Sequence, residues 1–347
     1  MEELKDKKLQ NEAADTEAPL DKNLRLMSPT RMVVRRFFRS KLSIIGLVMV
    51  VGLFLFSFVG PVIYDAWGET ELDESGKIDY EAAERTYTVD GVEYKVEQVR
   101  ENWKKDNALA PSSKDHLLGT DKQGYDVFVR LMYGGRISLT VSFIAVFVIT
   151  LLGTVLGGVA GYFGGVIDNV IMRICDILIC LPGIPILLII STVLSASDID
   201  KKYIIYLLMI YLTLFSWPGT ARLVRGQILS LREQEYMVAA EAMGYSTPRK
   251  IFKHLVPNVM PQLIVQMSLS LGSMILYEAT LSYLGLGVQA PYAAWGTMIE
   301  IISKDMDVMQ NYLNVWVPAG VCIVIAVLGF NFVGDGLRDA LDPKARR

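Results

Sequence analysis

The sequence predicts an all-α polytopic membrane protein with six transmembrane helices and a small extracytoplasmic α/β insert. The main observation is that apolar residues gather in long runs. A helix needs about 20 apolar residues to cross the roughly 30 Å of bilayer hydrocarbon. Six runs approach or exceed that length: residues 42–63, 138–161, 168–194, 203–221, 260–284 and 312–334.

Charge and residue usage argue against several other classes of protein. The net charge of −3 argues against a nucleic-acid partner. Cys175, Cys180 and Cys322 all fall inside expected spans, where they act as small apolar residues rather than disulfide partners or metal ligands. His116 and His254 lie far apart and outside the spans, so we expect no histidine-based metal site.

The first apolar run, 42–63, is expected to be a permanent anchor. It starts too far into the chain for a cleaved signal, and no small-residue cleavage pattern follows it closely. Lysine and arginine concentrate on the cytoplasmic side of membrane proteins. The segment 1–41 is therefore expected to be cytoplasmic, because it ends in a basic cluster without acids: Arg31, Arg35, Arg36, Arg39 and Lys41.

Three further segments give the same topology. The loop 222–258 and the tail 335–347 are rich in lysine and arginine, and both fall on the cytoplasmic side if six helices cross the membrane. The segment 64–137 falls outside, and it opens with the acidic stretch "DAWGETELDESGKIDYEAAE". Both termini are therefore expected in the cytoplasm.

The outer segment 64–137 combines an insert with a stretch that precedes the second helix. "RTYTVDGVEYKVE" alternates apolar and polar residues around Asp90-Gly91, which predicts a β-hairpin with a two-residue turn. "VEQVRENWKKD" predicts a short helix after it. The insert is interpreted either as a solvated cap or as a contact surface for an external partner.

The remaining five spans form an expected core, 138–334, in which glycine recurs every four residues along one helix. Such a strip allows the backbone of another helix to approach closely, so tight helix packing is predicted. A flexible joint at the inner end is the alternative. The strip consists of Gly153, Gly157, Gly161 and Gly165.

Few charged residues fall within or near these spans. Asp168, Arg173 and Asp176 cluster at the inner end of the third span, and the last two have the spacing of a helical ion pair, with a substrate site as the alternative. Glu278 lies about 9 Å inside the fifth span at about 1.5 Å per residue. A carboxylate at that depth must face protein or water. Glu278 is therefore expected either to lock neighbouring helices or to line a translocation path.

The cytoplasmic loop 222–258 is much longer than a connection between two helices requires. Ala239, Ala240, Ala242 and Met243 favour a short helix that ends in a left-handed turn at Gly244. In the next stretch, Ser246 or Thr247 is expected to cap a second short helix that has Pro248 at its first position and runs to about His254. Pro257 is expected to separate that helix from the fifth span.

This loop resembles the coupling loop of ABC importer permeases, whose pattern is Glu-Ala-Ala, three residues, Gly, nine residues and Ile-x-Leu-Pro. The two alanines, the glycine and the proline match, whereas Val238, His254 and Val256 stand where the family has Glu, Ile and Leu. Glu235 or Glu241 is the candidate replacement for the family glutamate. The resemblance assigns ATPase coupling to Glu235, Val238, Ala239, Ala240, Glu241, Ala242, Met243, Gly244 and Pro257.

Four further motifs are similar to the C-type subunit of oligopeptide and dipeptide permeases. They are "RRFFRSKLSIIGLVM", "LLGTDKQGYDVFVRLMYGGRISL", "LSYLGLGVQAPYAAWGTMI" and "GDGLRDALDPK". Tyr125 stands at a usual arginine and Ala290 at a usual proline. The resemblance covers the chain except about residues 64–110.

The resemblance implies the type I ABC importer fold, a five-helix core preceded by a helix that leans on a partner, in a bacterial plasma membrane. It implies a homologous B-type permease that completes the path, two ATPase subunits that bind ATP-Mg, and an extracellular binding protein that delivers peptide. No G-x-x-x-x-G-K-[ST] phosphate loop is present, so this chain is expected to be non-catalytic and to bind no cofactor.

Three alternatives remain. Nickel or glutathione importers look alike, and the scarcity of histidine argues weakly against nickel. An intramembrane enzyme is disfavoured, because H-E-x-x-H is absent and no histidine lies within a span. An ion channel would have no need of the coupling loop.

Overall fold

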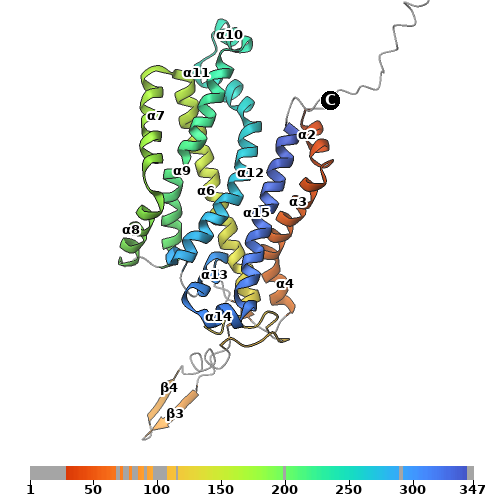
Figure 1. The fold of residues 1–347 in the computed structure, drawn as a ribbon, viewed down its shortest axis with the longest axis vertical. Helices are drawn as coiled ribbons and strands as arrows, with labels where there is room; N and C mark the ends of the chain where they lie inside the picture. Colours follow the sequence, from red (N-terminus) through yellow and green to blue (C-terminus); the bar gives the residue numbers. More distant parts are fainter. Residues whose placement is uncertain are drawn as a thin grey trace, which may run out of the picture.

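The computed structural model describes residues 29–67, 71–72, 78–79, 85–89, 92–96, 108–114, 116–197, 201–288 and 292–341. Its described part is a bundle of long helices with short helices at both ends (Figure 1). Five helical segments are long and apolar enough to span a membrane: Lys41–Ile63, Val127–Phe163, Tyr206–Arg232, Thr247–Leu286 and Leu313–Leu341.

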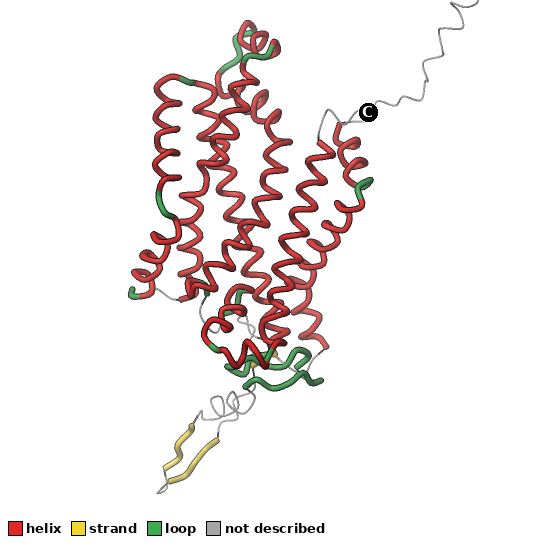
Figure 2. The backbone as a smooth tube through the Cα atoms, in the orientation of Figure 1, coloured by secondary structure: helices red, strands yellow, loops and turns green. Residues whose placement is uncertain are grey.

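Figure 2 shows helix along nearly the whole bundle, with strands only in the insert. Two of the spans contain α-helical and π-helical stretches in succession. The N-terminal and second spans comprise α2 (Pro29–Phe37), α3 (Lys41–Phe54), η1 (Leu55–Val59), α4 (Gly60–Trp67) and α6 (Val127–Phe163). The middle of the chain forms α7 (Gly165–Cys180), α8 (Gly183–Ser195), α9 (Lys201–Arg232), α10 (Glu235–Ala242), α11 (Thr247–Arg249) and η2 (Lys250–Leu255). The rest forms α12 (Val256–Leu281), η3 (Ser282–Leu286), α13 (Trp295–Lys304), α14 (Met306–Asn311) and α15 (Leu313–Leu341).

The expected third span, 168–194, is not one straight helix. It consists of α7 and α8, which meet at an angle of 76°. A residue before proline is biased away from helical geometry, and Leu181, before Pro182, has an extended backbone (φ −74°, ψ 132°). The pair counts as one bent span, which brings the total to six.

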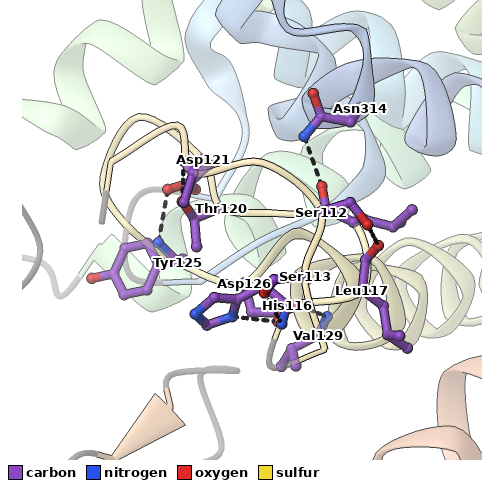
Figure 3. A network of polar contacts seen from close by, with 12 residues as sticks. Ser112, Ser113, His116, Leu117, Thr120, Asp121, Tyr125, Asp126, Val129 and Asn314 are labelled. Atoms are coloured by element: carbon purple, nitrogen blue, oxygen red, sulfur yellow. Dashed lines mark hydrogen bonds and ion pairs between the residues drawn. The ribbon is translucent and has the colours of Figure 1, made fainter. Parts of the chain in front are cut away.

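The second helix begins at Val127, well before the apolar run at 138–161. Asp126 caps it by accepting a hydrogen bond from the Val129 amide at 2.9 Å. His116 Nδ1 lies 2.9 Å from the other carboxylate oxygen of Asp126 (Figure 3). The stretch before α6 is thus a folded element, although its polar residues give no apolar pattern.

The same stretch is tied to the core at two further points (Figure 3). Asp121 accepts hydrogen bonds from the Tyr125 amide at 2.9 Å and from Arg130 Nη1 at 2.5 Å. Asn314, at the start of α15, donates a hydrogen bond to the Leu118 carbonyl at 2.7 Å. These contacts hold the beginnings of α6 and α15 together at one end of the bundle.

The expected close approach along the glycine strip occurs between α6 and α9. A Cβ atom on Gly153 would lie 2.5 Å from Thr220 Cβ, and one on Gly161 would lie 2.9 Å from the Arg225 carbonyl oxygen. At Gly157 it would collide with the Ala221 backbone. The strip therefore packs two helices together. Gly165 is not part of it, because it begins α7 with a φ of +56°.

The first span packs against the last span of its own chain. A Cβ atom on Gly46 of α3 would lie 2.8 Å from the Gly329 carbonyl oxygen of α15. The first span also contacts the second, because Arg136 of α6 donates hydrogen bonds to the carbonyls of Ser57 (2.8 Å) and Phe58 (2.9 Å) in η1. The contact of this helix with a partner subunit stays a prediction.

The predicted hairpin is present in the insert. β3 (Arg85–Val89) pairs antiparallel with β4 (Val92–Val96), and Val89 pairs with Val92. The two residues expected in the turn, Asp90 and Gly91, lie outside the described residues. A second, shorter pair joins β1 (Glu71–Leu72) to β2 (Ile78–Asp79). The short helix expected in "VEQVRENWKKD" lies outside the described residues beyond Val96.

The two ends of the bundle differ in the segments that they carry. Figure 1 places α2, α10, α11 and the last turns of α15 at one end, and α13, α14 and the β3–β4 hairpin at the other. The segments that were expected in the cytoplasm from their basic residues therefore share one end. The acidic insert lies at the opposite end.

We predict that Gly157→Ala destabilises the protein, whereas Gly158→Ala does not. The new Cβ at position 157 meets the Ala221 backbone, and that at position 158 meets no atom within 4 Å. Overpacking costs roughly 1–3 kcal/mol, while alanine favours a helix over glycine by about 1 kcal/mol. Thermal unfolding in detergent should show a lower Tm for the first variant only. Equal Tm values would contradict the assigned contact.

Candidate functional site

The helix α10 and the turn after it form a small projection at the end of the bundle that carries α2, which we call the knob (residues 235–246) (Figure 1). Gly244 has a φ of +70°, as expected for the left-handed turn. The Tyr245 amide donates to the Ala240 carbonyl (3.1 Å) and the Gly244 amide to the Glu241 carbonyl (2.9 Å). This pair of bonds is the Schellman motif that ends a helix.

One face of the knob is seated on the bundle. Met237 and Ala240 are buried, and Met237 joins an apolar cluster with Ile228 of α9 and Leu263 of α12. Ala240 was expected to contact an ATPase surface, but it is only 1% exposed. A larger side chain at Ala240 would therefore disturb the seat of the knob rather than its outer surface.

The opposite face of the knob is open. Val238 is 62% exposed and Met243 is 61% exposed, and Phe252 of η2 adds a third large apolar side chain at 66%. The other residues that sequence analysis assigned to coupling on this segment are also exposed: Glu235, Ala239, Glu241, Ala242 and Gly244. Phe252 was not predicted from the sequence as a coupling residue. The one feature that could have indicated it is a large apolar side chain within a basic loop.

Pro257 does not separate the second short helix from the fifth span. The chain is helical without interruption from Thr247 to Leu281, through α11, η2 and α12. In η2 the hydrogen bonds reach five residues back, as from the Val256 amide to the Ile251 carbonyl, and Pro257 then falls in the first turn of α12, where a missing N–H is tolerated. The knob is therefore connected rigidly to a membrane helix. Ser246 does precede the helix, but its side chain makes no capping bond.

Lys250 joins the knob to the end of α6. Its side chain is buried, with Nζ 3.6 Å from Glu241 Oε1 and 5.6 Å from the centre of the Tyr162 ring. Nearby, the Arg249 guanidinium lies 4.1 Å from the centre of the Tyr245 ring, which stacks on His254. Neither arrangement was predicted from the sequence, because the first depends on the packing of α6 against this segment and the second on the fold of the chain after Gly244.

The predicted ion pair at the inner end of the third span is not the main one there. Arg173 lies 4.0 Å from Asp176, at the limit for an ion pair, and is largely exposed, whereas Arg222 of α9 reaches Asp176 at 2.6 Å. Arg225 of α9 binds both carboxylate oxygens of Asp168 at 2.5 Å. The acids of α7 therefore pair across to α9. This result follows from the approach of the two helices and not from their sequence spacing.

Glu278 is fully buried at the meeting point of three helices. Its carboxylate accepts hydrogen bonds from Ser138 of α6 (2.8 Å) and Ser282 of η3 (2.7 Å). The Trp295 amide at the start of α13 donates to the Ser138 hydroxyl (3.2 Å), and the Trp295 indole donates to the Leu131 carbonyl (2.9 Å). We call this group of residues the lock. It offers the carboxylate two hydroxyl donors, and none of the described cations is among its partners.

The fold and the knob define a multi-pass membrane permease, and comparison with known proteins gives its family. Residues 153–347 match the family described as "Binding-protein-dependent transport system inner membrane component". Residues 28–75 match the "N-terminal TM domain of oligopeptide transport permease C". The chain belongs to this family of inner-membrane components of binding-protein-dependent transport systems.

Similar proteins cover nearly the whole chain. It is 36% identical over 336 residues to the oligopeptide transport system permease protein OppC of Bacillus subtilis, which covers 96% of this chain and 95% of that protein. It is 34% identical to the dipeptide transport system permease protein DppC of Alkalihalophilus pseudofirmus over 92% of this chain and 91% of that protein. It is 44% identical to the oligopeptide transport system permease protein OppC of Salmonella typhimurium, over 71% of this chain and 78% of that protein.

We predict that Glu278→Leu lowers both stability and transport, and that Glu278→Gln disturbs transport more than membrane insertion. Leucine leaves the Ser138 and Ser282 hydroxyls without their acceptor, and a buried unsatisfied group costs about 1–3 kcal/mol. Glutamine keeps one acceptor oxygen. Insertion, thermal unfolding and uptake should be measured for each variant.

Thr280→Val is a matched control for the lock, because that exposed hydroxyl bonds only to the Leu276 carbonyl of its own helix. It should behave like the wild type. Wild-type unfolding and uptake in Glu278→Leu would show that the carboxylate is dispensable.

Proposed function

We propose that this chain is the permease subunit of an ATP-driven importer for oligopeptides or dipeptides. The observation that carries the proposal is the knob, a helix with a seated face and an open apolar face, which the turn at Gly244 joins to a helix that runs into the membrane-spanning part. The relatives named for oligopeptide and dipeptide transport support peptides over nickel or glutathione. They also favour a transporter over a channel or an intramembrane enzyme.

The proposed complex divides the work among several chains. A homologous permease completes the translocation path, and an extracellular binding protein delivers the peptide. Two cytoplasmic ATPase subunits bind and hydrolyse ATP with magnesium, while this chain catalyses no reaction and needs no cofactor. It lies in a bacterial plasma membrane with both termini in the cytoplasm, and the basic residues at the α2 end support that orientation.

The contacts of the knob suggest how motion reaches the membrane. An ATPase that grips Val238, Met243 and Phe252 would push on the seated helix α10. Beyond the turn at Gly244, the push passes into α12 through the continuous helix from Thr247 to Leu281. Lys250 passes it to the end of α6, so that the helices tilt as rigid bodies between two states.

The orientation predicts opposite labelling of two engineered cysteines. Lys114 precedes α6 at one end of the bundle, Met243 lies on the knob at the other, and both side chains are exposed. In a background with Cys180 replaced by serine, an impermeant thiol reagent should label Lys114→Cys in intact cells. Met243→Cys should react only after lysis. The reverse pattern would invert the proposed topology.

The proposed coupling predicts that Gly244→Arg leaves the chain inserted but abolishes peptide-stimulated ATP hydrolysis and uptake. A side chain in the left-handed conformation costs roughly 1–2 kcal/mol and shifts the turn, and the arginine would hold the ATPase away. Ala240→Arg should act differently, because Ala240 is buried: it should loosen the knob and lower the Tm as well. The assay uses vesicles that contain all subunits.

Gly226→Arg is the control for added charge. Gly226, in α9, also has open space around it but lies outside the knob. If Gly244→Arg hydrolyses ATP and imports peptide like the wild type at matched expression, the knob is a passive connection.

A further inference from the structure

A cavity of about 210 Å³, lined by both polar and apolar side chains, lies between α9 and α12 within the membrane-spanning part of the bundle. Its inner wall is apolar and buried, with Ile149 of α6, Leu212 of α9 and Met274 of α12. Its other lining residues are Ser216, Gly219, Thr220, Gln266, Ser270, Ser273 and Tyr277.

The polar side chains of the cavity follow one face of α12. Gln266, Ser270, Ser273 and Tyr277 are spaced four, three and four residues apart, which places them on the same side of a helix. At about 1.5 Å per residue they extend along about 16 Å of the span. Within this row Gln266 Nε2 lies 3.3 Å from Ser270 Oγ, so the row is hydrogen bonded in part.

The cavity is open toward the outside of this subunit. Gly219 and Ser273, which border it, are both exposed, and a Cβ atom on Gly219 would meet no atom within 4 Å. Polar groups at this depth are costly when they face lipid and are expected to face protein or water. We therefore expect the open side to face protein or water and not the bilayer.

The polar side chains that line the cavity carry no formal charge. No Asp, Glu, Lys, Arg or His is among the residues that border the cavity in the described part of the chain. Glu278 follows Tyr277 directly, yet its carboxylate points away into the lock and is fully buried. Of the two roles that the sequence left open for Glu278, its contacts favour the lock. The polar groups that border the cavity are instead neutral hydroxyl and amide groups.

We propose that this face of α9 and α12 is one wall of the peptide path, and that it binds the peptide backbone without regard to side-chain charge. Hydroxyl and carboxamide groups both donate and accept hydrogen bonds, so they pair with the N–H and C=O groups that every peptide carries. A fixed charge on the wall would instead attract some cargo and repel other cargo. The proposal rests on the proposed function, because the occupant is a peptide.

The test introduces a charge at Ser273, which is exposed and whose side chain donates a hydrogen bond to the Leu269 carbonyl of its own helix. Uptake of Ala-Glu-Ala and of Ala-Lys-Ala is measured in vesicles that contain the whole complex. Ser273→Lys should raise the Glu-to-Lys uptake ratio relative to wild type, and Ser273→Asp should lower it. A unit charge within a few ångströms gives a shift of roughly tenfold or more in each direction. The same binding protein is used throughout, so its own preference between the two peptides cancels when the uptake ratio of a variant is divided by that of the wild type.

A cysteine variant keeps the test decisive if a charged residue at position 273 prevents assembly, and a pair of variants in the first span serves as the control. Ser273→Cys, with Cys180 replaced by serine, is assembled first and then modified with a cationic or an anionic thiosulfonate. Gly52→Lys and Gly52→Asp place the same charges on the first span, where Gly52 is exposed with open space around it. The control pair should leave the ratio unchanged.

The outcomes separate the two proposals. Opposite shifts at Ser273 with none at Gly52 support the charge-neutral wall. Equal loss of both peptides at Ser273, or no change, overturns it even though the wild-type complex imports peptide. No uptake of either peptide by the wild-type complex would overturn the proposed function itself.

Discussion

The close contact between α6 and α9 is the interaction on which the rest of the structure depends. Gly153, Gly157 and Gly161 allow the two backbones to touch, so the helices run side by side through the membrane. This contact sets the position of the C-terminal half of α9, from which Arg225 reaches Asp168 and Arg232 reaches the Gly161 and Tyr162 carbonyls. Cations at the end of α6 also suit the negative end of its helix dipole.

Polar groups within the spans are arranged in two different ways. In the lock, Glu278 is enclosed and bonded to two serines, which fixes α6, α12 and α13 at one end of the bundle. In the cavity, the neutral side chains from Gln266 to Tyr277 border open space. A buried polar group whose hydrogen bonds are satisfied rigidifies its surroundings, whereas uncharged groups beside a cavity leave room for a passing molecule. One helix, α12, carries both arrangements on different faces.

The knob links these features to the cytoplasmic end. Its buried face rests on residues of both α9 and α12, so any displacement of the knob acts on the two helices that border the cavity. Lys250 adds α6 as a third point of attachment. The three elements that meet at the knob are therefore the same three that form the cavity wall.

The sequence by itself determined the features that depend on local pattern. Run lengths predicted the spans, and basic residues predicted which segments share an end. Gly244 predicted its left-handed turn, and the alternation around Asp90-Gly91 predicted the pairing of the flanking strands. Each of these signals lies within a few neighbouring residues. The tertiary structure decided what depends on contacts between distant segments. Spacing along α7 suggested Arg173 as the partner of Asp176, but Arg222 lies closer across the helix interface. The resemblance to the coupling loop assigned Ala240 to ATPase coupling, but packing turns its side chain inward. The partners of Glu278 come from residues as distant as Ser138, so no local pattern could name them.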